Sequence, residues 1–190
     1  DVEAVTVSVS AGLVAVSGGG LRMDNTIDNT VVASMTGGMN VMALGDVDVS
    51  ASDNAYLEGD ATNVTLAIGL GAAIGVSDVL NAITSDVSAS VMGASSTDRL
   101  DLWADNLSVS ALADAEIERT KTVGVAASLL GVAVNLAEAK VSTSASALVG
   151  QANVSVANDL IISASGVNEA DASAVGGAFG AIAAGAMVSA

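Results

Sequence analysis

Val5-Thr6-Val7-Ser8-Val9 alternates apolar and small polar side chains, and runs of the same kind return along the chain. Val64-Thr65-Leu66-Ala67-Ile68 follows after 59 residues, and Val123-Gly124-Val125-Ala126-Ala127 follows after another 59. A fourth run starts at Phe179-Gly180-Ala181-Ile182, 56 residues further on. Strict alternation indicates β-strands, and a fixed period of this length indicates stacked units. We therefore expect an elongated all-β fold, a repetitive β-solenoid of the parallel β-helix kind.

A second signature supports the repeat, because each copy closes with a strand that ends in Ser-Ala. These strands are residues 45–51, 105–111 and 158–164, and their Ser-Ala pairs lie 60 and then 53 residues apart. The third copy is therefore shorter, and we expect the missing residues between Lys140 and Asn153, in a turn. Residues 1–190 are expected to be one repetitive segment of a longer polypeptide, with copies at about 5–63, 64–122 and 123–178 and the start of a fourth at 179–190.

Shorter alternating runs and turn clusters fill the rest of each copy. The expected strands are residues 30–35, 40–43, 86–91, 99–103, 140–145 and 153–156. The expected turns are residues 18–20, 36–38, 95–98 and 150–151, which are rich in Gly, Ser, Thr and Asp. The long apolar runs 5–16, 64–80 and 123–137 are expected as strands that face a narrow core. Helix stays an alternative for 66–80 and 123–136, because Ala and Leu are good helix formers.

Composition excludes several partners. The net charge is −16 with only five basic residues, so there is no basic patch for nucleic acid, and anionic membranes are disfavoured. There is one Trp, one Tyr and one Phe, so the core must consist of small aliphatic side chains. The apolar run 64–80 contains Ser77 and Asp78, and we expect no transmembrane insertion.

Catalysis has little support in the sequence. The chain has neither His nor Cys, so the commonest general base and the thiol nucleophile are missing. Lys121 and Lys140 lie among serines, but solvated strand positions explain them better than Ser-Lys chemistry. The carboxylate pairs Asp46/Asp48 and Asp24/Asp28 lack an aromatic groove that could hold a sugar. We expect no enzyme and assign no catalytic residue.

Calcium is the most plausible bound ion. Carboxylates gather in two sets that turn carbonyls could complete to the six to eight oxygens that Ca²⁺ prefers. The first set is Asp46, Asp48 and Asp53, and the second is Asp98, Asp101 and Asp105. Neither set matches a known calcium loop, and charged turns that prevent aggregation are the simpler interpretation.

The succession of an apolar Gly/Ala/Val strand, Asp28-Asn29-Thr30-Val31-Val32-Ala33 and Gly45-Asp46-Val47-Asp48-Val49-Ser50-Ala51 resembles known repeats. They are those of large bacterial surface proteins of the filamentous-haemagglutinin and autotransporter-adhesin type. The resemblance covers essentially the whole chain and implies a secreted, right-handed β-helical stalk or fibre. The chain differs from the family by having few Gly-Gly-Asp turns.

Together these observations predict a structural or adhesive protein, extracellular or on a bacterial cell surface, that forms a stalk or filament. Its expected partners are further repeats of the same polypeptide or identical subunits, and a host or neighbouring-cell surface. The alternative is a carbohydrate-active or carbohydrate-binding β-helix, and a membrane pore former is a third class.

Overall fold

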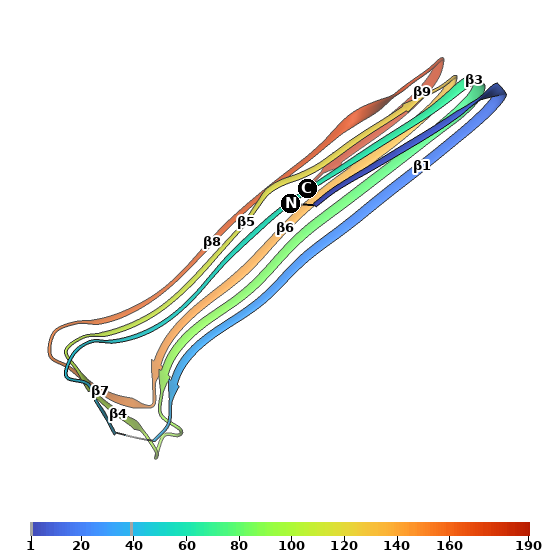
Figure 1. Cartoon of the computed structure of the whole chain (residues 1–190). Coiled ribbons are helices and arrows are strands. Elements are labelled where there is room, and N and C mark those ends of the chain that lie inside the picture. The colour runs from blue at the N-terminus through green and yellow to red at the C-terminus, as the bar shows by residue number, and fades with distance from the viewer. Residues whose placement is uncertain (1, 39) are drawn as a thin grey trace.

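The computed structural model describes residues 2–38 and 40–190, which form strands and no helix (Figure 1). Long strands run side by side and give the molecule its elongated shape. The strands are β1 (Val2–Thr36), β2 (Asn40–Met42), β3 (Val47–Met92), β4 (Leu100–Ala104), β5 (Leu107–Ala127), β6 (Leu130–Gly150), β7 (Ala152–Val156), β8 (Leu160–Phe179) and β9 (Ile182–Ser189). The expected all-β class is confirmed, and the helix alternative for the apolar runs is wrong.

Successive passes of the chain stack as layers, and every pairing between them is parallel. β3 reverses direction near Gly69, so its first half pairs with β5 and its second half with β6. A layer therefore has an outgoing strand, a returning strand and a short closing strand, which is β2, β4 or β7. We call the end with the closing strands the base. We call the opposite end the tip, formed by residues 4–21, 61–77, 122–137 and 172–190 (Figure 1).

The register confirms the Ser-Ala signature. Ser50 lies beside Ser110, which lies beside Ser163, in neighbouring layers. The register of the apolar runs differs from the one that the sequence spacing predicts, which would pair Val5 with Val64. In the structure Val5 pairs with Thr62, and Val7 pairs with Val64. This shift of two residues leaves each side chain on the same face of the sheet.

The shortening of the third copy falls where it was predicted. Residues 93–99 connect β3 to β4, whereas Gln151 alone connects β6 to β7 and has a φ of 49°. The layers above and below this point keep their pairing. The length difference is thus absorbed in a turn at the base.

At the base, alternate side chains pack into an apolar core between the outgoing, returning and closing strands. Leu107 and Val109 come from an outgoing strand, Val87 and Val91 from a returning strand, and Leu100 from a closing strand. All five are almost fully buried. This half follows the usual pattern for strands that cover a core, with mainly small polar and acidic side chains outside and a few exposed apolar ones such as Val32, Leu112 and Leu148.

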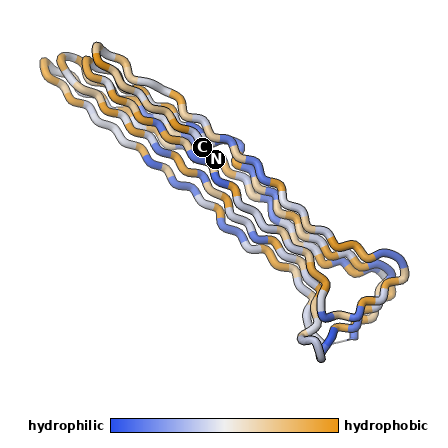
Figure 2. Tube along the Cα trace, turned by 180° about the vertical axis from the view of Figure 1, so that it is seen from behind, coloured by the Kyte–Doolittle hydropathy of each residue, from blue (hydrophilic) through white to orange (hydrophobic). Residues whose placement is uncertain are grey.

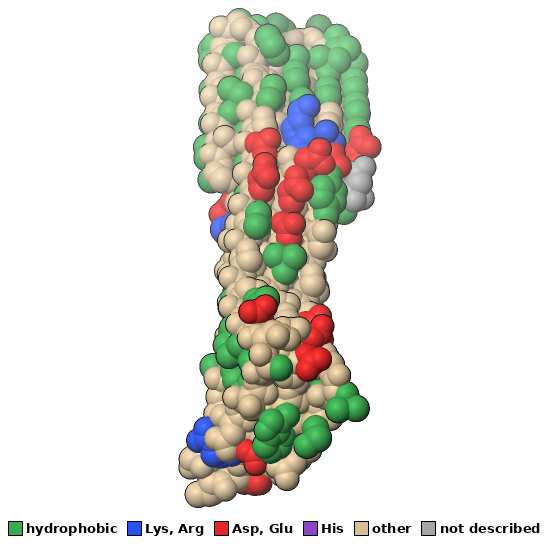
Figure 3. Space-filling model, turned by 90° about the vertical axis from the view of Figure 1, so that its left-hand side faces the viewer, with side chains coloured by type: hydrophobic (Ala, Val, Ile, Leu, Met, Phe, Trp, Pro, Cys, Tyr) green, Lys and Arg blue, Asp and Glu red, His purple; other side chains and the backbone are tan. Residues whose placement is uncertain are grey.

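At the tip this pattern is inverted, and the expectation that the long apolar runs face the core is wrong. Val5, Val7 and Val9 are 60%, 63% and 61% exposed. The buried cluster between the two sheets consists of five alanines. They are Ala15, Ala67, Ala73, Ala126 and Ala133. Figure 3 shows hydrophobic side chains on the outer surface of this end, and the trace in Figure 2 shows that hydrophobic residues are frequent along its strands. The alternation simply continues from base to tip, so the parity of a position decides its face whatever side chain it carries.

Polar side chains inside the tip join the outgoing sheet to the returning sheet. Asn63 Nδ2 donates to the carbonyl oxygen of Val76 at 2.8 Å, and Asn135 Nδ2 donates to that of Gly124 at 3.3 Å. In the first layer, Ser17 Oγ donates to the carbonyl oxygen of Ser8 at 3.1 Å. Such short bridges fit only where the facing side chains are small, which explains the Gly and Ala at inward positions.

Residues 18–20 are not the turn that was expected, since they lie inside β1. Gly19 points inward, where a Cβ would lie 2.7 Å from Thr65 Cγ2 and 2.9 Å from Asn63 Oδ1. This glycine therefore makes room for the polar bridge. The reversals at the tip instead use positions such as Gly69, which has a φ of 119°.

Candidate ligand-binding site at the base

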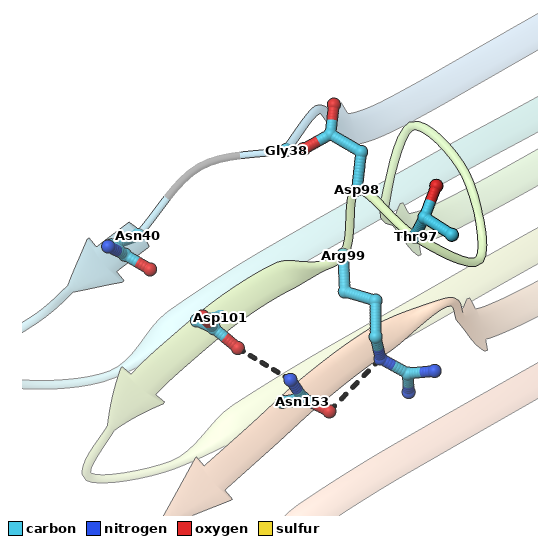
Figure 4. Close-up of a pocket in the computed structure, with 7 residues that line it drawn as sticks. All are labelled: Gly38, Asn40, Thr97, Asp98, Arg99, Asp101 and Asn153. Atoms are coloured by element: carbon cyan, nitrogen blue, oxygen red, sulfur yellow. Dashed lines mark hydrogen bonds between the residues drawn. The ribbon is translucent and has the colours of Figure 1, made fainter.

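A polar pocket opens beside the closing strands at the base (Figure 4). It has a volume of about 390 Å³, and its lining residues come from three layers. They are Gly38, Asn40, Thr97, Asp98, Arg99, Asp101 and Asn153.

Register places the central side chains of this pocket in a row. Asn40, Asp101 and Asn153 occupy paired positions of β2, β4 and β7. Asn153 Nδ2 donates to Asp101 Oδ1 at 2.7 Å, while Arg99 Nε donates to Asn153 Oδ1 at 3.1 Å. Arg99 is also held by the carbonyl oxygen of Ala152 at 2.9 Å. The row thus presents oriented donors and acceptors that suit a polar ligand such as a hydroxylated one.

The loop 93–99 brings Asp98 and Thr97 to the rim of the pocket. Ser95 Oγ accepts a hydrogen bond from the backbone N–H of Asp98 at 2.9 Å, and the N–H of Ser95 donates to the Asp98 carbonyl at 3.1 Å. Asp98 lies against Gly38, where an added Cβ would be 1.6 Å from Asp98 Oδ1. A side chain at position 38 would therefore force Asp98 to move away from its present place at the rim.

Trp103 adds a flat apolar surface next to the pocket. It lies two residues after Asp101 on the same outward face of β4, between Met42 and Ser155 of the neighbouring strands. The residue is 42% exposed. The alternation in Arg99-Leu100-Asp101-Leu102-Trp103 indicates that the polar residues and the Trp share one face of the strand. The prediction from the sequence did not combine them into a site.

The six carboxylates proposed for calcium are distributed over the base. Asp98 and Asp101 line the pocket, and the N–H of Asp105 donates to the Gly45 carbonyl in a turn. Asp46 accepts a hydrogen bond from Asn106 at 2.6 Å, and Asp48 lies beside Ser108 on the outgoing sheet.

Asp53 accepts hydrogen bonds from Asn29 at 3.0 Å and from Ser85 at 2.5 Å. Across residues 2–38 and 40–190, no three carboxylates, imidazoles or thiols are grouped so that they could hold a metal ion. Calcium binding stays a prediction, in which carbonyl oxygens or water would supply most ligands.

A belt of charged side chains separates tip from base. Its members are Glu3, Arg22, Asp24, Glu58, Asp60, Asp78, Glu118, Arg119, Lys121, Glu138, Lys140 and Asp171, and we call it the charged belt. Arg119 forms ion pairs with Asp60 at 2.8 Å and with Glu58, and Lys140 pairs with Glu138 at 2.6 Å. Hydrogen bonds to Asp24 and to Asp60 raise the pKa of Arg22 and Arg119, respectively, above the usual value. Lys140 thus pairs with a carboxylate and not with one of the neighbouring serines.

The chain matches no family model, and comparison with curated proteins and with solved structures found no match. Within the part of the chain that the structure describes, no helix is long and apolar enough to cross a membrane.

Proposed function

We propose that the chain is a section of a β-solenoid, a right-handed parallel β-helix, that works as a structural or adhesive stalk or filament outside a bacterial cell. The observation that carries this proposal is the in-register, parallel stacking of its layers. Connections between parallel strands are almost always right-handed, which supports the handedness.

The outermost strands support growth of the stack by further layers. Among the described residues, β1 pairs with β3 alone, and β8 pairs with β5 alone. β9 is exposed along its whole length, whereas the central strand β3 alternates between buried and exposed positions. Such open edges are templates for another strand. The occupants would be further layers of the same polypeptide or a second copy.

Electron microscopy of the purified protein tests the proposal, and we expect filaments or end-to-end assemblies. Val32→Pro and Ala33→Pro in β1 form a matched pair, because successive N–H groups of a strand point to opposite neighbours. In one of the two variants the proline removes an N–H group that donates to β3, so this variant should melt at a lower temperature. In the other variant the proline removes an N–H group at the open edge. That variant should keep its stability but no longer assemble. Strictly monomeric wild-type particles, or assembly by both variants, would contradict the proposal.

The pocket and Trp103 favour a second candidate function, the binding of carbohydrate. An aromatic face covers the apolar side of a sugar ring, and a neighbouring row of amide and carboxylate groups suits its hydroxyls. Trp103→Ala and Asp101→Asn should each weaken binding on a glycan array by at least about tenfold, which corresponds to about 1.4 kcal/mol. Tyr56→Ala, which removes another exposed aromatic residue outside the pocket, is the control. Sugar binding that survives Trp103→Ala would exclude this site.

A further inference from the structure

The tip is free of charge in every layer. Residues 4–21, 61–77, 122–137 and 172–190 contain no Asp, Glu, Lys or Arg, although the chain has 21 acidic residues. The parallel register brings these four stretches together at one end of the stack. The charged residues therefore begin at a common level, the charged belt (Figure 3).

Both outer faces of the tip are apolar. On the outgoing face Ile68 is 54% and Phe179 63% exposed, and on the returning face Val16 is 71% and Ile182 67% exposed. Four strands spaced by about 4.8 Å and eight residues long at about 3.3 Å each give roughly 500 Å² per face. Exposed apolar patches of this size usually mark an interaction surface.

The geometry favours an occupant that covers both faces at once. Face-to-face contact with a second copy would bury only one face, and about 500 Å² is less than the roughly 800 Å² per partner of a standard interface. A lipid bilayer is fluid and covers both faces and the turns together. Strands of about 26 Å are also long enough to enter one leaflet, whose hydrocarbon is about 15 Å deep.

The amide donors inside the tip are compatible with this environment. Asn63 donates to the carbonyls of Gly19 and Val76, and Asn135 donates to those of Gly124 and Val175, so these donors need no water. Among the described residues, three buried oxygen atoms of the tip have no hydrogen-bond partner, namely Ser10 Oγ, Asn63 Oδ1 and Thr122 Oγ1. Backbone groups of the inner strands are paired between layers, as a lipid environment requires. At the open edges of β1, β8 and β9 the inference rests on the stacking proposed above, which would pair them.

The charged belt supplies groups for the lipid–water boundary. Arg22, Arg119, Lys121 and Lys140 are four of the five basic residues of the chain. Long basic side chains at such a boundary can reach phosphate groups while their stems lie along apolar surface. The acidic members of the belt and the net charge of −16 oppose anionic lipids. We propose that the tip inserts into one leaflet of a bilayer with zwitterionic headgroups, and that the charged belt limits its depth.

Flotation with phosphatidylcholine vesicles tests the proposal on the intact chain. We expect the protein to float with these vesicles. A smaller fraction should float when about 30% of the lipid is phosphatidylglycerol, because the negative surface potential of such vesicles repels the acidic chain. Ile68→Ser/Ile74→Ser removes two exposed side chains from the tip and should lower the bound fraction at least about tenfold. Leu112→Ser/Leu148→Ser removes two exposed side chains on the other side of the belt and should leave flotation unchanged.

A fluorescence measurement tests which end of the protein enters the membrane. Native Trp103 lies at the base, so brominated phosphatidylcholine should not quench it. In a Trp103→Phe background, Ile68→Trp places the reporter in the tip and should give quenched, blue-shifted emission with the same vesicles. Absence of flotation, equal loss in the control pair, or quenching of Trp103 would each overturn the proposal. So would a tip-dependent dimer in sedimentation that vesicles do not dissociate, because it would assign the tip to a second copy.

Discussion

Single inward side chains decide how closely the two sheets approach at the tip. Asn135 bridges the sheets, accepts a hydrogen bond from Ser77 Oγ at 2.6 Å and lies against Gly124, where a Cβ would be 1.9 Å from its Oδ1. Gly124→Ala should therefore lower the free energy of unfolding by about 1–3 kcal/mol, as overpacking does. Chemical denaturation measures the change. Asn135→Ala should cost a similar amount alone, by loss of its hydrogen bonds.

The double variant Gly124→Ala/Asn135→Ala tests whether the cost of Gly124→Ala comes from a clash with Asn135. Because Asn135→Ala removes the atom that would clash, Gly124→Ala should cost clearly less in the Asn135→Ala background. If the loss of unfolding free energy in the double variant equals the sum of the two single losses, the two side chains do not compete for the same space.

At the scale of elements, the reversal of β3 depends on Gly69. Its φ of 119° suits glycine, and a Cβ would lie 1.8 Å from the carbonyl oxygen of Gly12. Gly69→Ala should thus destabilise the protein by about 1–3 kcal/mol, seen as a lower melting temperature. Gly20→Ala, where no atom lies within 4 Å of the added Cβ, is the control and should be nearly neutral. Equal melting temperatures for both variants would show that the turn tolerates a side chain.

Element type was largely predictable from the sequence, and the direction of the side chains was predictable at the base but not at the tip. Alternation and the repeat identify the strands, and the Ser-Ala signature even gives the register of Ser50 with Ser110 and Ser163. Hydrophobicity normally tells which face is inside, but in 5–16 it gives the wrong face, because Gly, Ala and Ser fill the interior there. The pocket at the base was missed because its residues come from three layers and meet only through the lateral pairing.

At the scale of the whole molecule, charge should control association. A net charge of −16 makes two copies repel one another at low ionic strength, and salt screens this repulsion over a Debye length of about 8 Å at 0.15 M. Light scattering should therefore show faster assembly as sodium chloride is raised from about 0.02 to 0.5 M, toward shorter Debye lengths. Assembly that slows with salt would mean that ion pairs, and not stacked edges, hold the copies together.

The parallel stacking also has a consequence for how the chain reaches its structure. Partners in neighbouring layers are more than fifty residues apart, as in Ser50 with Ser110 or Leu107 with Leu160, so no hairpin-type pairing can nucleate the fold. Pairings between distant residues form slowly, because the intervening loop must first be closed. A chain emerging from a ribosome or an export channel would gain its first inter-strand bonds only after more than one complete layer had appeared. After that, each new layer can pair with a layer that is already folded and serves as its template. Folding would therefore proceed from one end of the stack, in the order in which the chain is synthesised or exported.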